Sequence, residues 1–140
     1  MIIGLVGSGK TTLYRKLNEN RIYNAVEIEL PQSCISNERL KRELFLLYMN
    51  DDNIDCIIVH PYYLSDVFKT FDLDISYLNV PKKERIRRIM SRCKSLGTDI
   101  DSLFPKDFLN EEEKYFKSFL KQNEIYHLSS LHQHLLIRIG

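Results

Sequence analysis

The sequence predicts an α/β domain of three layers, in which helices flank both faces of a five-stranded parallel sheet. Two observations predict it. Short apolar segments rich in β-branched residues alternate with segments of helical periodicity along the whole chain, and a glycine-rich loop joins the first such pair. Strict alternation of strands and helices is typical of parallel sheets joined by right-handed crossovers. The sequence contains no repeat or linker, so we expect residues 1–140 to form a single domain.

Five segments have the composition of strands. The first is a continuous apolar run, the second alternates polar and apolar side chains, and the third is a buried-type run that Pro61 ends. In chain order the predicted strands are residues 1–6, 24–30, 55–61, 73–81 and 124–129.

Four segments between and after these strands have helical periodicity, at residues 10–20, 36–50, 82–93 and 105–123. Ser36 or Asn37 is suited to cap the second helix, Pro81 to the first turn of the third, and Gly97 to its end. Residues 131–139 are predicted as a terminal helix or strand.

Two of these helices show a clear apolar stripe. The stripe of the third helix consists of Ile86, Ile89, Met90 and Cys93. The stripe of the fourth consists of Phe108, Leu109, Phe116, Phe119 and Leu120. We expect these faces to pack on the sheet.

The glycine-rich loop GLVGSGKT matches the pattern G-x-x-x-x-G-K-[ST] at Gly4 to Thr11, and we call these residues the P-loop. Glycines allow successive backbone N–H groups to point inward around an anion, and the helix that follows adds its N-terminal amides. In this pattern the lysine, Lys10, reaches the β- and γ-phosphates, and the hydroxyl of Thr11 binds Mg²⁺. The strand before the loop and the helix after it match this context. The sequence therefore predicts a P-loop NTPase fold that binds ATP and Mg²⁺, with phosphates held by Gly7, Ser8, Gly9, Lys10, Thr11 and Thr12.

Composition limits the other functions. A net charge of +1 argues against an extended nucleic-acid or membrane surface, and no apolar run approaches the length of a membrane span. The three cysteines are widely spaced and odd in number, which favours reduced thiols over a disulfide framework or a zinc site. Because the P-loop begins three residues after Met1, we expect no signal peptide and a cytoplasmic location.

The segment from Lys82 to Lys94 carries seven basic residues and only one acidic residue, Glu84. Arg85, Arg88 and Arg92 recur at three- and four-residue spacing and would form one ridge of the helix. Such a ridge could be a solvated face. At the ligand-binding edge of the sheet it could instead clamp the phosphates during transfer, as guanidinium groups do.

The stretch YLNVPKKERIRRIMSRC, with the later DFLNEEEKYFKSFL, resembles deoxynucleoside kinases and their relatives, the thymidylate and nucleoside monophosphate kinases. The resemblance covers the P-loop and roughly residues 76 to 128. It implies that Arg88 and Arg92 act in catalysis and that a lid over about residues 94–105 closes on ATP and excludes water. The arginine motif departs from the family only in its last place, where Lys94 stands.

The same resemblance implies two acidic groups in the middle of the chain. A glutamate near the end of the second strand would be the general base for a sugar hydroxyl, and Glu29 or Glu27 stands there, with a plain surface carboxylate as the alternative. The third strand should end in a carboxylate but ends in His60, which could hydrogen-bond a phosphate or sugar yet suits Mg²⁺ poorly. Asp66 could replace the missing metal ligand, or could be a solvated helix residue.

These observations predict a phosphotransferase that moves the γ-phosphoryl group of ATP to a (deoxy)nucleoside or a nucleoside monophosphate. Lys10, Arg88, Arg92 and Glu29 are its expected catalytic residues, and Thr11 and Asp66 its expected metal ligands. Two alternatives stay open: a polynucleotide 5′-hydroxyl kinase, which the net charge supports little beyond the arginine helix, and a non-catalytic nucleotide-binding regulator. The partner is expected to be a small molecule, with a homodimer among the open oligomeric states.

Overall fold

The computed structural model describes residues 1–21, 23–123 and 129–131, and contains one parallel sheet of five strands in the order β2-β3-β1-β4-β5. All four pairings between neighbouring strands are parallel, as the sequence predicts. The strands are β1 (Ile2–Ile3), β2 (Ala25–Ile28), β3 (Cys56–Val59), β4 (Ser76–Leu78) and β5 (Ser129–Leu131). Of the predicted last strand, residues 124–128 lie outside the described part, as do residues 132–139 of the predicted terminal element.

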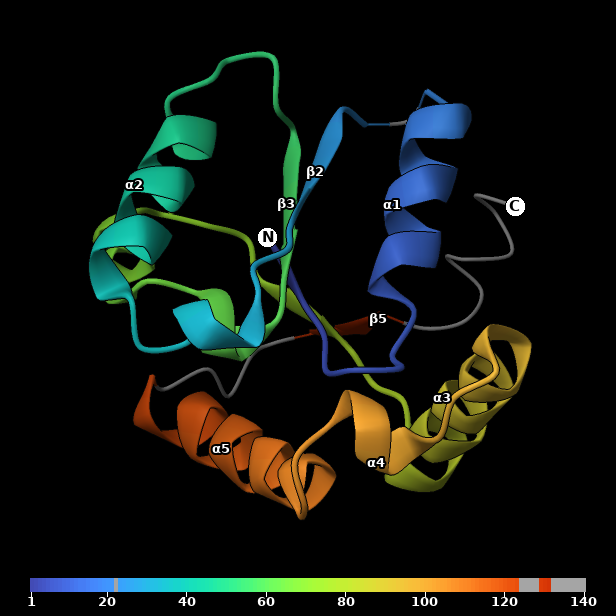
Figure 1. Ribbon diagram of the computed structural model, residues 1–140. Coiled ribbons are helices and arrows are strands. Elements are labelled where there is room, and N and C mark those ends of the chain that lie inside the picture. Colours follow the sequence, from blue (N-terminus) through green and yellow to red (C-terminus); the bar gives the residue numbers. More distant parts are fainter. Residues whose placement is uncertain (22, 124–128, 132–140) are drawn as a thin grey trace.

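Helices cover both faces of this sheet (Figure 1). The main helices are α1 (Lys10–Glu19), α2 (Glu38–Met49), α3 (Lys82–Leu96), α4 (Ile100–Leu103) and α5 (Phe108–Gln122). In Figure 1, α1 lies on one side of the strands and α2 with α5 on the other, while α3 lies beneath α1. The three-layer α/β architecture predicted from the sequence is confirmed.

Two apolar clusters, one for each face of the sheet, join the layers. Phe45 of α2 and Phe119 of α5 pack with Ile3, Ile57 and other inward side chains of the strands. On the opposite face, Leu13 and Leu17 of α1 pack against β2, β3 and β4. Alternate residues of the short strands therefore serve opposite faces, as expected for a sheet buried on both sides.

Local signals set most helix ends. The side chain of Asn37 accepts a hydrogen bond from the backbone N–H of Leu40, so Asn37 is the N-cap of α2. Pro81 stands at the N-cap position of α3, and Gly97 ends that helix with a φ of 68°. Within the described residues, no helix combines the length and the apolar character needed to cross a bilayer.

The buried face of α3 differs from the predicted stripe. Ile89 and Cys93 are buried as expected, but Met90 is 58% exposed and Arg85 is 1% exposed. The spacing of Arg85, Ile89 and Cys93 is four residues, which defines the face of α3 that turns inward.

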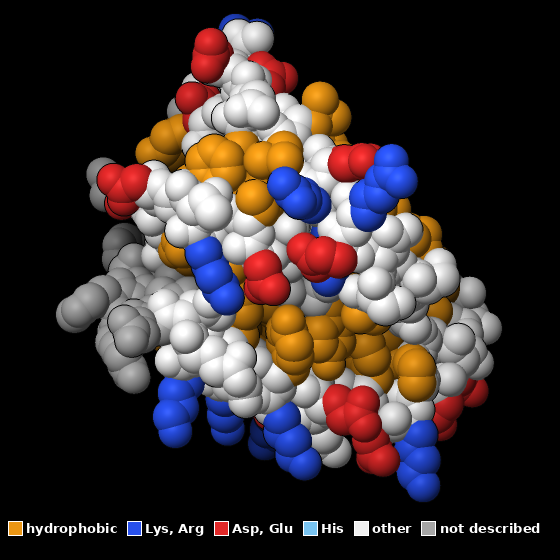
Figure 2. Space-filling model, turned by 90° about the vertical axis from the view of Figure 1, so that its left-hand side faces the viewer, with side chains coloured by type: hydrophobic (Ala, Val, Ile, Leu, Met, Phe, Trp, Pro, Cys, Tyr) orange, Lys and Arg blue, Asp and Glu red, His pale blue; other side chains and the backbone are white. Residues whose placement is uncertain are grey.

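The face formed by α2 and α5 shows a band of apolar side chains surrounded by charged ones of both signs (Figure 2). Aromatic contacts join α5 to the segment that follows β3. The Tyr62 ring lies 4.8 Å from the ring of Tyr115 and 5.9 Å from that of Phe108. These rings tie the segment after β3 to α5.

Strand register places the functional segments at one edge. Ile3 pairs with Val59, and Val59 pairs with Ile28, so the last residues of β1, β3 and β2 lie side by side. The next residues along the chain emerge together from this carboxyl edge: Gly4, which opens the P-loop, His60 and Glu29. Ligands of open parallel sheets bind at this edge.

Candidate functional site

The P-loop has the backbone conformation that its glycines allow. Gly7 and Gly9 have φ values of 77° and 97°, in the left-handed region that favours glycine, and α1 begins directly after Gly9. Gly7 is also required by packing, since a Cβ there would lie 2.8 Å from the carbonyl oxygen of Arg85 in α3. The loop therefore presents the amides of a helix N-terminus on a turn that suits an anion.

The ammonium group of Lys10 is largely removed from water, and this changes its pKa. Its Nζ donates a hydrogen bond to the carbonyl oxygen of Leu5 at 3.0 Å. Desolvation lowers the pKa of Lys10 to about 8, against the opposing influence of Glu112, Glu27 and Glu29. A cation held mainly by a neutral carbonyl is well placed to receive an anionic phosphate.

Thr11 and Glu27 form the polar pair next to Lys10. The Thr11 hydroxyl donates to the carboxylate of Glu27, whose two oxygens lie 2.9 and 3.0 Å away. Burial raises the pKa of Glu27, partly offset by this hydrogen bond. A hydroxyl oxygen beside a carboxylate is the donor set that Mg²⁺ prefers, so these two residues fit the metal that the P-loop motif predicts.

The second carboxylate of this segment, Glu29, follows the end of β2 and lines the same pocket. Of the two glutamates that the sequence left open, Glu27 is bound to Thr11, whereas Glu29 is exposed at the pocket. The two therefore occupy different surroundings in one site.

The three arginines predicted as a ridge of α3 do not act as one surface. Arg88 and Arg92 line the pocket, and Nη1 of Arg88 donates to the carbonyl oxygen of Gly7 at 3.3 Å. Arg85 instead points into the protein, where it pairs with Glu112 at 2.6 Å and with Glu113 at 2.7 Å. The expectation that Arg85 belongs to a phosphate clamp is wrong, because its guanidinium is paired with the buried carboxylate of Glu112 and the partly exposed one of Glu113.

His60 is buried in the wall of the pocket, and both of its ring nitrogens have partners in the protein. Nδ1 accepts the backbone N–H of Tyr62 at 3.0 Å, and Nε2 lies 2.7 Å from a carboxylate oxygen of Glu112. An acceptor Nδ1 requires the proton on Nε2, which is donated to Glu112. Burial lowers the pKa of His60, consistent with a neutral ring. The expectation that His60 hydrogen-bonds a phosphate or sugar is therefore not met in this structure.

Asp66, the expected second metal ligand, is absent from the residues that line the pocket. It opens a short 3-10 helix (Asp66–Thr70), and its side chain is exposed and lies 3.6 Å from Lys69. Ser65 caps this helix by accepting a hydrogen bond from the backbone N–H of Val67. Asp66 is therefore a solvated helix residue, which was the alternative to a metal ligand.

One pocket of about 780 Å³ collects the remaining expected residues. Its polar lining holds the P-loop, Glu27, Glu29, Arg88 and Arg92. Its apolar lining comes from the segment after β2, from Tyr63, and from the expected lid. The lid segment forms the end of α3 and α4, and contributes Leu103 and Phe104. The pocket-lining residues from the P-loop onward are Val6, Gly7, Ser8, Gly9, Lys10, Thr11, Thr12, Lys16, Glu27, Ile28, Glu29, Leu30, Pro31, His60, Tyr63, Arg88, Ile89, Arg92, Leu103 and Phe104.

The sequence interpretation missed Glu112. This carboxylate is fully buried in α5 and bonds to residues of three other segments. A signal for it existed, because Glu112 stands four residues from both Phe108 and Phe116 and so interrupts the apolar stripe of α5.

No family model and no curated protein matches this sequence. Among solved structures, the chain is similar to deoxyadenosine kinase from M. mycoides. The form with bound dATP has a TM-score of 0.50 and 18% identity, over 93% of this chain and 87% of the kinase chain. The form with the products dCMP and a flexible dCDP has a TM-score of 0.49 and 17% identity, over 94% and 88%. At such identities the likeness concerns the fold alone: this chain shares the fold of that deoxyadenosine kinase.

Proposed function

We propose that this protein is an ATP-dependent phosphotransferase that moves the γ-phosphoryl group to a (deoxy)nucleoside or a nucleoside monophosphate. One observation carries the proposal. One pocket holds the P-loop with Lys10, the Thr11–Glu27 pair, the exposed Glu29, two arginines of α3, and an apolar lining that suits a nucleobase.

Each group has a role in phosphoryl transfer. The P-loop amides and Lys10 bind the β- and γ-phosphates, and Arg88 with Arg92 stabilise negative charge that develops on the transferred group. Thr11 and Glu27 would hold Mg²⁺, which neutralises phosphate charge when bound. Glu29 accepts the proton of a nucleoside hydroxyl, while a monophosphate acceptor relies more on arginines.

The apolar lining supports a small acceptor. Tyr63, Leu103 and Phe104 come from the 3-10 helix after β3 and from the segment around α4. Flat and apolar walls with a few polar groups are typical of small-molecule sites. The deoxyadenosine kinase with the similar fold binds dATP, which is compatible with a nucleotide in this pocket.

The proposal is tested by transfer from γ-labelled Mg-ATP to three separate pools: nucleosides, nucleoside monophosphates and 5′-hydroxyl oligonucleotides. We expect a labelled product in one of the first two pools. The product should be lost in Lys10→Met and kept in Lys69→Met, which removes an exposed lysine outside the pocket.

Two results would overturn the proposal in different ways. Label on the oligonucleotides alone would identify a polynucleotide 5′-hydroxyl kinase. Tight ATP binding with no labelled acceptor in any pool would identify a nucleotide-binding regulator.

A further inference from the structure

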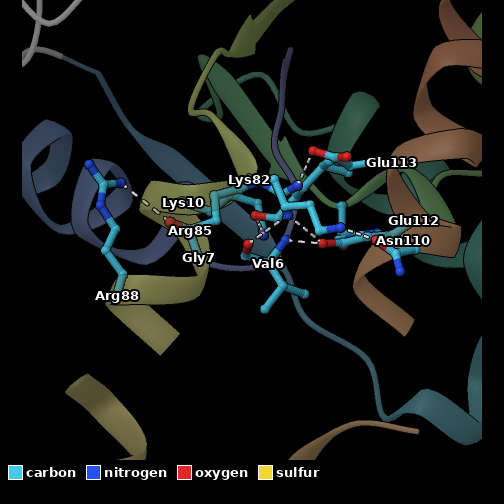
Figure 3. A network of polar contacts seen from close by, with 11 residues as sticks. Val6, Gly7, Lys10, Lys82, Arg85, Arg88, Asn110, Glu112 and Glu113 are labelled. Atoms are coloured by element: carbon cyan, nitrogen blue, oxygen red, sulfur yellow. Dashed lines mark hydrogen bonds and ion pairs between the residues drawn. The ribbon is translucent and has the colours of Figure 1, made fainter. Parts of the chain in front are cut away.

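A fully buried carboxylate, Glu112 of α5, lies beside Val6 of the P-loop (Figure 3). Its Oε1 accepts from Nη1 of Arg85 at 2.6 Å. Its Oε2 lies 2.7 Å from Nε2 of His60 and 3.3 Å from the backbone nitrogen of Val6, which donates to it. One side chain thus joins α3, the end of β3 and the P-loop.

Stability alone does not explain this group. Taking a carboxylate and a guanidinium out of water is costly, and well-packed apolar residues often replace such a buried pair without loss. Both carboxylate oxygens of Glu112 have partners, whereas Nε of the buried Arg85 has none among the described residues. The short buried contacts of the Glu112 carboxylate fix the positions of the segments that they join.

The segment that it fixes is the first half of the P-loop. Both backbone groups of Val6 are held: the N–H by Glu112, and the carbonyl oxygen by Nη1 of Arg85 at 3.3 Å. The next carbonyl, that of Gly7, accepts from Arg88 at 3.3 Å. The preceding carbonyl, that of Leu5, accepts from Lys10. The carbonyl oxygens of Leu5, Val6 and Gly7 therefore each accept a hydrogen bond from a side chain. Two of these donor side chains belong to α3.

Glu112 also holds the arginine that contacts Val6. Arg85 has a second carboxylate partner, Glu113, at 2.7 Å, and Lys82 donates to the side chain of Asn110 nearby. These contacts bind α3 to α5. Glu112 differs from Glu113 because only Glu112 also contacts the P-loop among the described interactions.

We propose that Glu112 is a positioning residue that holds the first half of the P-loop in its phosphate-binding conformation, through Val6 directly and through Arg85. The inference rests on the proposed function only in that the P-loop binds a nucleotide. It requires no phosphoryl transfer, so it is tested by binding of ADP.

The primary test compares Glu112→Gln with Glu113→Gln by calorimetric titration with Mg-ADP. Glutamine keeps an oxygen for Val6 but cannot accept from both His60 and Arg85. We expect the dissociation constant to rise roughly tenfold or more in Glu112→Gln, because small displacements of a binding loop are costly. Glu113→Gln, which leaves Val6 held, should bind ADP as the unchanged protein does. Equal affinity of Glu112→Gln and the unchanged protein would overturn the proposal.

A second variant separates positioning from folding. In the double variant Arg85→Leu with Glu112→Leu the buried charges are removed together, so the fold is expected to persist, as its melting temperature will report. Val6 then lacks both partners, and ADP affinity should fall as in Glu112→Gln. A double variant with an unchanged melting temperature and unchanged ADP affinity would show that the network does not position the loop.

A measurement on the unchanged protein needs no variant. The backbone N–H of Val6 should exchange with solvent slowly, since Glu112 accepts it. Exchange as fast as in an unstructured peptide would overturn the proposal whatever the variants do.

Discussion

Arg85 and Arg88 lie one turn apart on α3 and both donate to a P-loop carbonyl, yet their surroundings differ. The side chain of Arg85 is 2% exposed and is bound by two carboxylates of α5. The side chain of Arg88 is 37% exposed, lines the pocket, and pairs with Glu84 on its own helix. Burial thus distinguishes Arg85, which holds the P-loop, from Arg88, which is accessible to a ligand in the pocket.

The same substitution at both positions should reveal the largest difference between the two arginines. Arg85→Leu leaves Glu112 charged, buried and without its guanidinium, so the free energy of unfolding should fall by about 3–5 kcal/mol. Arg88→Leu removes a half-exposed group, so its effect should stay below about 1 kcal/mol. Urea denaturation of the two variants provides the measurement. Equal losses would show that burial does not distinguish the two arginines.

Lys10 offers a pH test of the neighbouring charge. Its pKa of about 8 in the folded chain is below the usual 10.5, so the folded state loses this proton first as pH rises. Burial of charged Lys10 therefore opposes folding below pH 8, and this opposition is relieved between pH 8 and 10.5. The contribution of Lys10 between pH 7.5 and 9.5 should be at most about 2 kcal/mol.

This contribution is isolated by comparison with Lys10→Met. The difference in unfolding free energy between the unchanged protein and the variant should shift in favour of the unchanged protein as pH rises from 7.5 to 9.5. Other groups that titrate in this range are common to both chains and cancel. A difference that does not change with pH would contradict the lowered pKa of Lys10.

The pocket arginines should affect turnover and leave the fold intact. We expect Arg88→Gln and Arg92→Gln each to lower kcat/KM roughly 100-fold, as the loss of one donor to developing charge does. Arg87→Gln is the matched control, because Arg87 lies on the same helix, outside the pocket lining, and pairs with Glu84. Loss of turnover in Arg87→Gln as large as in Arg88→Gln would mean that the charge of the helix, and not its pocket face, matters.

The comparison also explains how far sequence could predict this site. The P-loop and Thr11 were predictable because a local motif and the alternation of strands and helices place them at one edge of the sheet, and the family resemblance pointed to Glu29 or Glu27 at the same edge. The role of Arg85 was not, because its partner stands 27 residues away in α5. Periodicity assigned it to the same ridge as Arg88, and spacing alone does not reveal which side of a helix is covered.

His60 and Asp66 follow the same logic. A missing carboxylate after β3 suggested a search along the same segment, and Asp66 was its nearest acid. The fold instead brings the carboxylate of Glu112, 52 residues from His60. Among the residues that the structure describes, the short contacts of Glu112 with His60 and Arg85 join segments distant in sequence, where motifs carry little information.

The smallest expected effect concerns Glu84, which pairs with Arg88, the more exposed of the two arginines compared. Glu84 accepts from both Arg87 and Arg88, and these hydrogen bonds hold its pKa at about 2. Its carboxylate is therefore charged throughout the range of an enzyme assay, so its contribution should not vary between pH 5 and 9. Because an exposed ion pair is weak, Glu84→Gln should raise the KM for ATP only about two- to fivefold. A loss as large as that of Arg88→Gln would mean that Arg88 depends on Glu84 for its position, as Arg85 depends on Glu112. The more exposed Arg88 would then also be held in place by a carboxylate, and burial would not distinguish the two arginines.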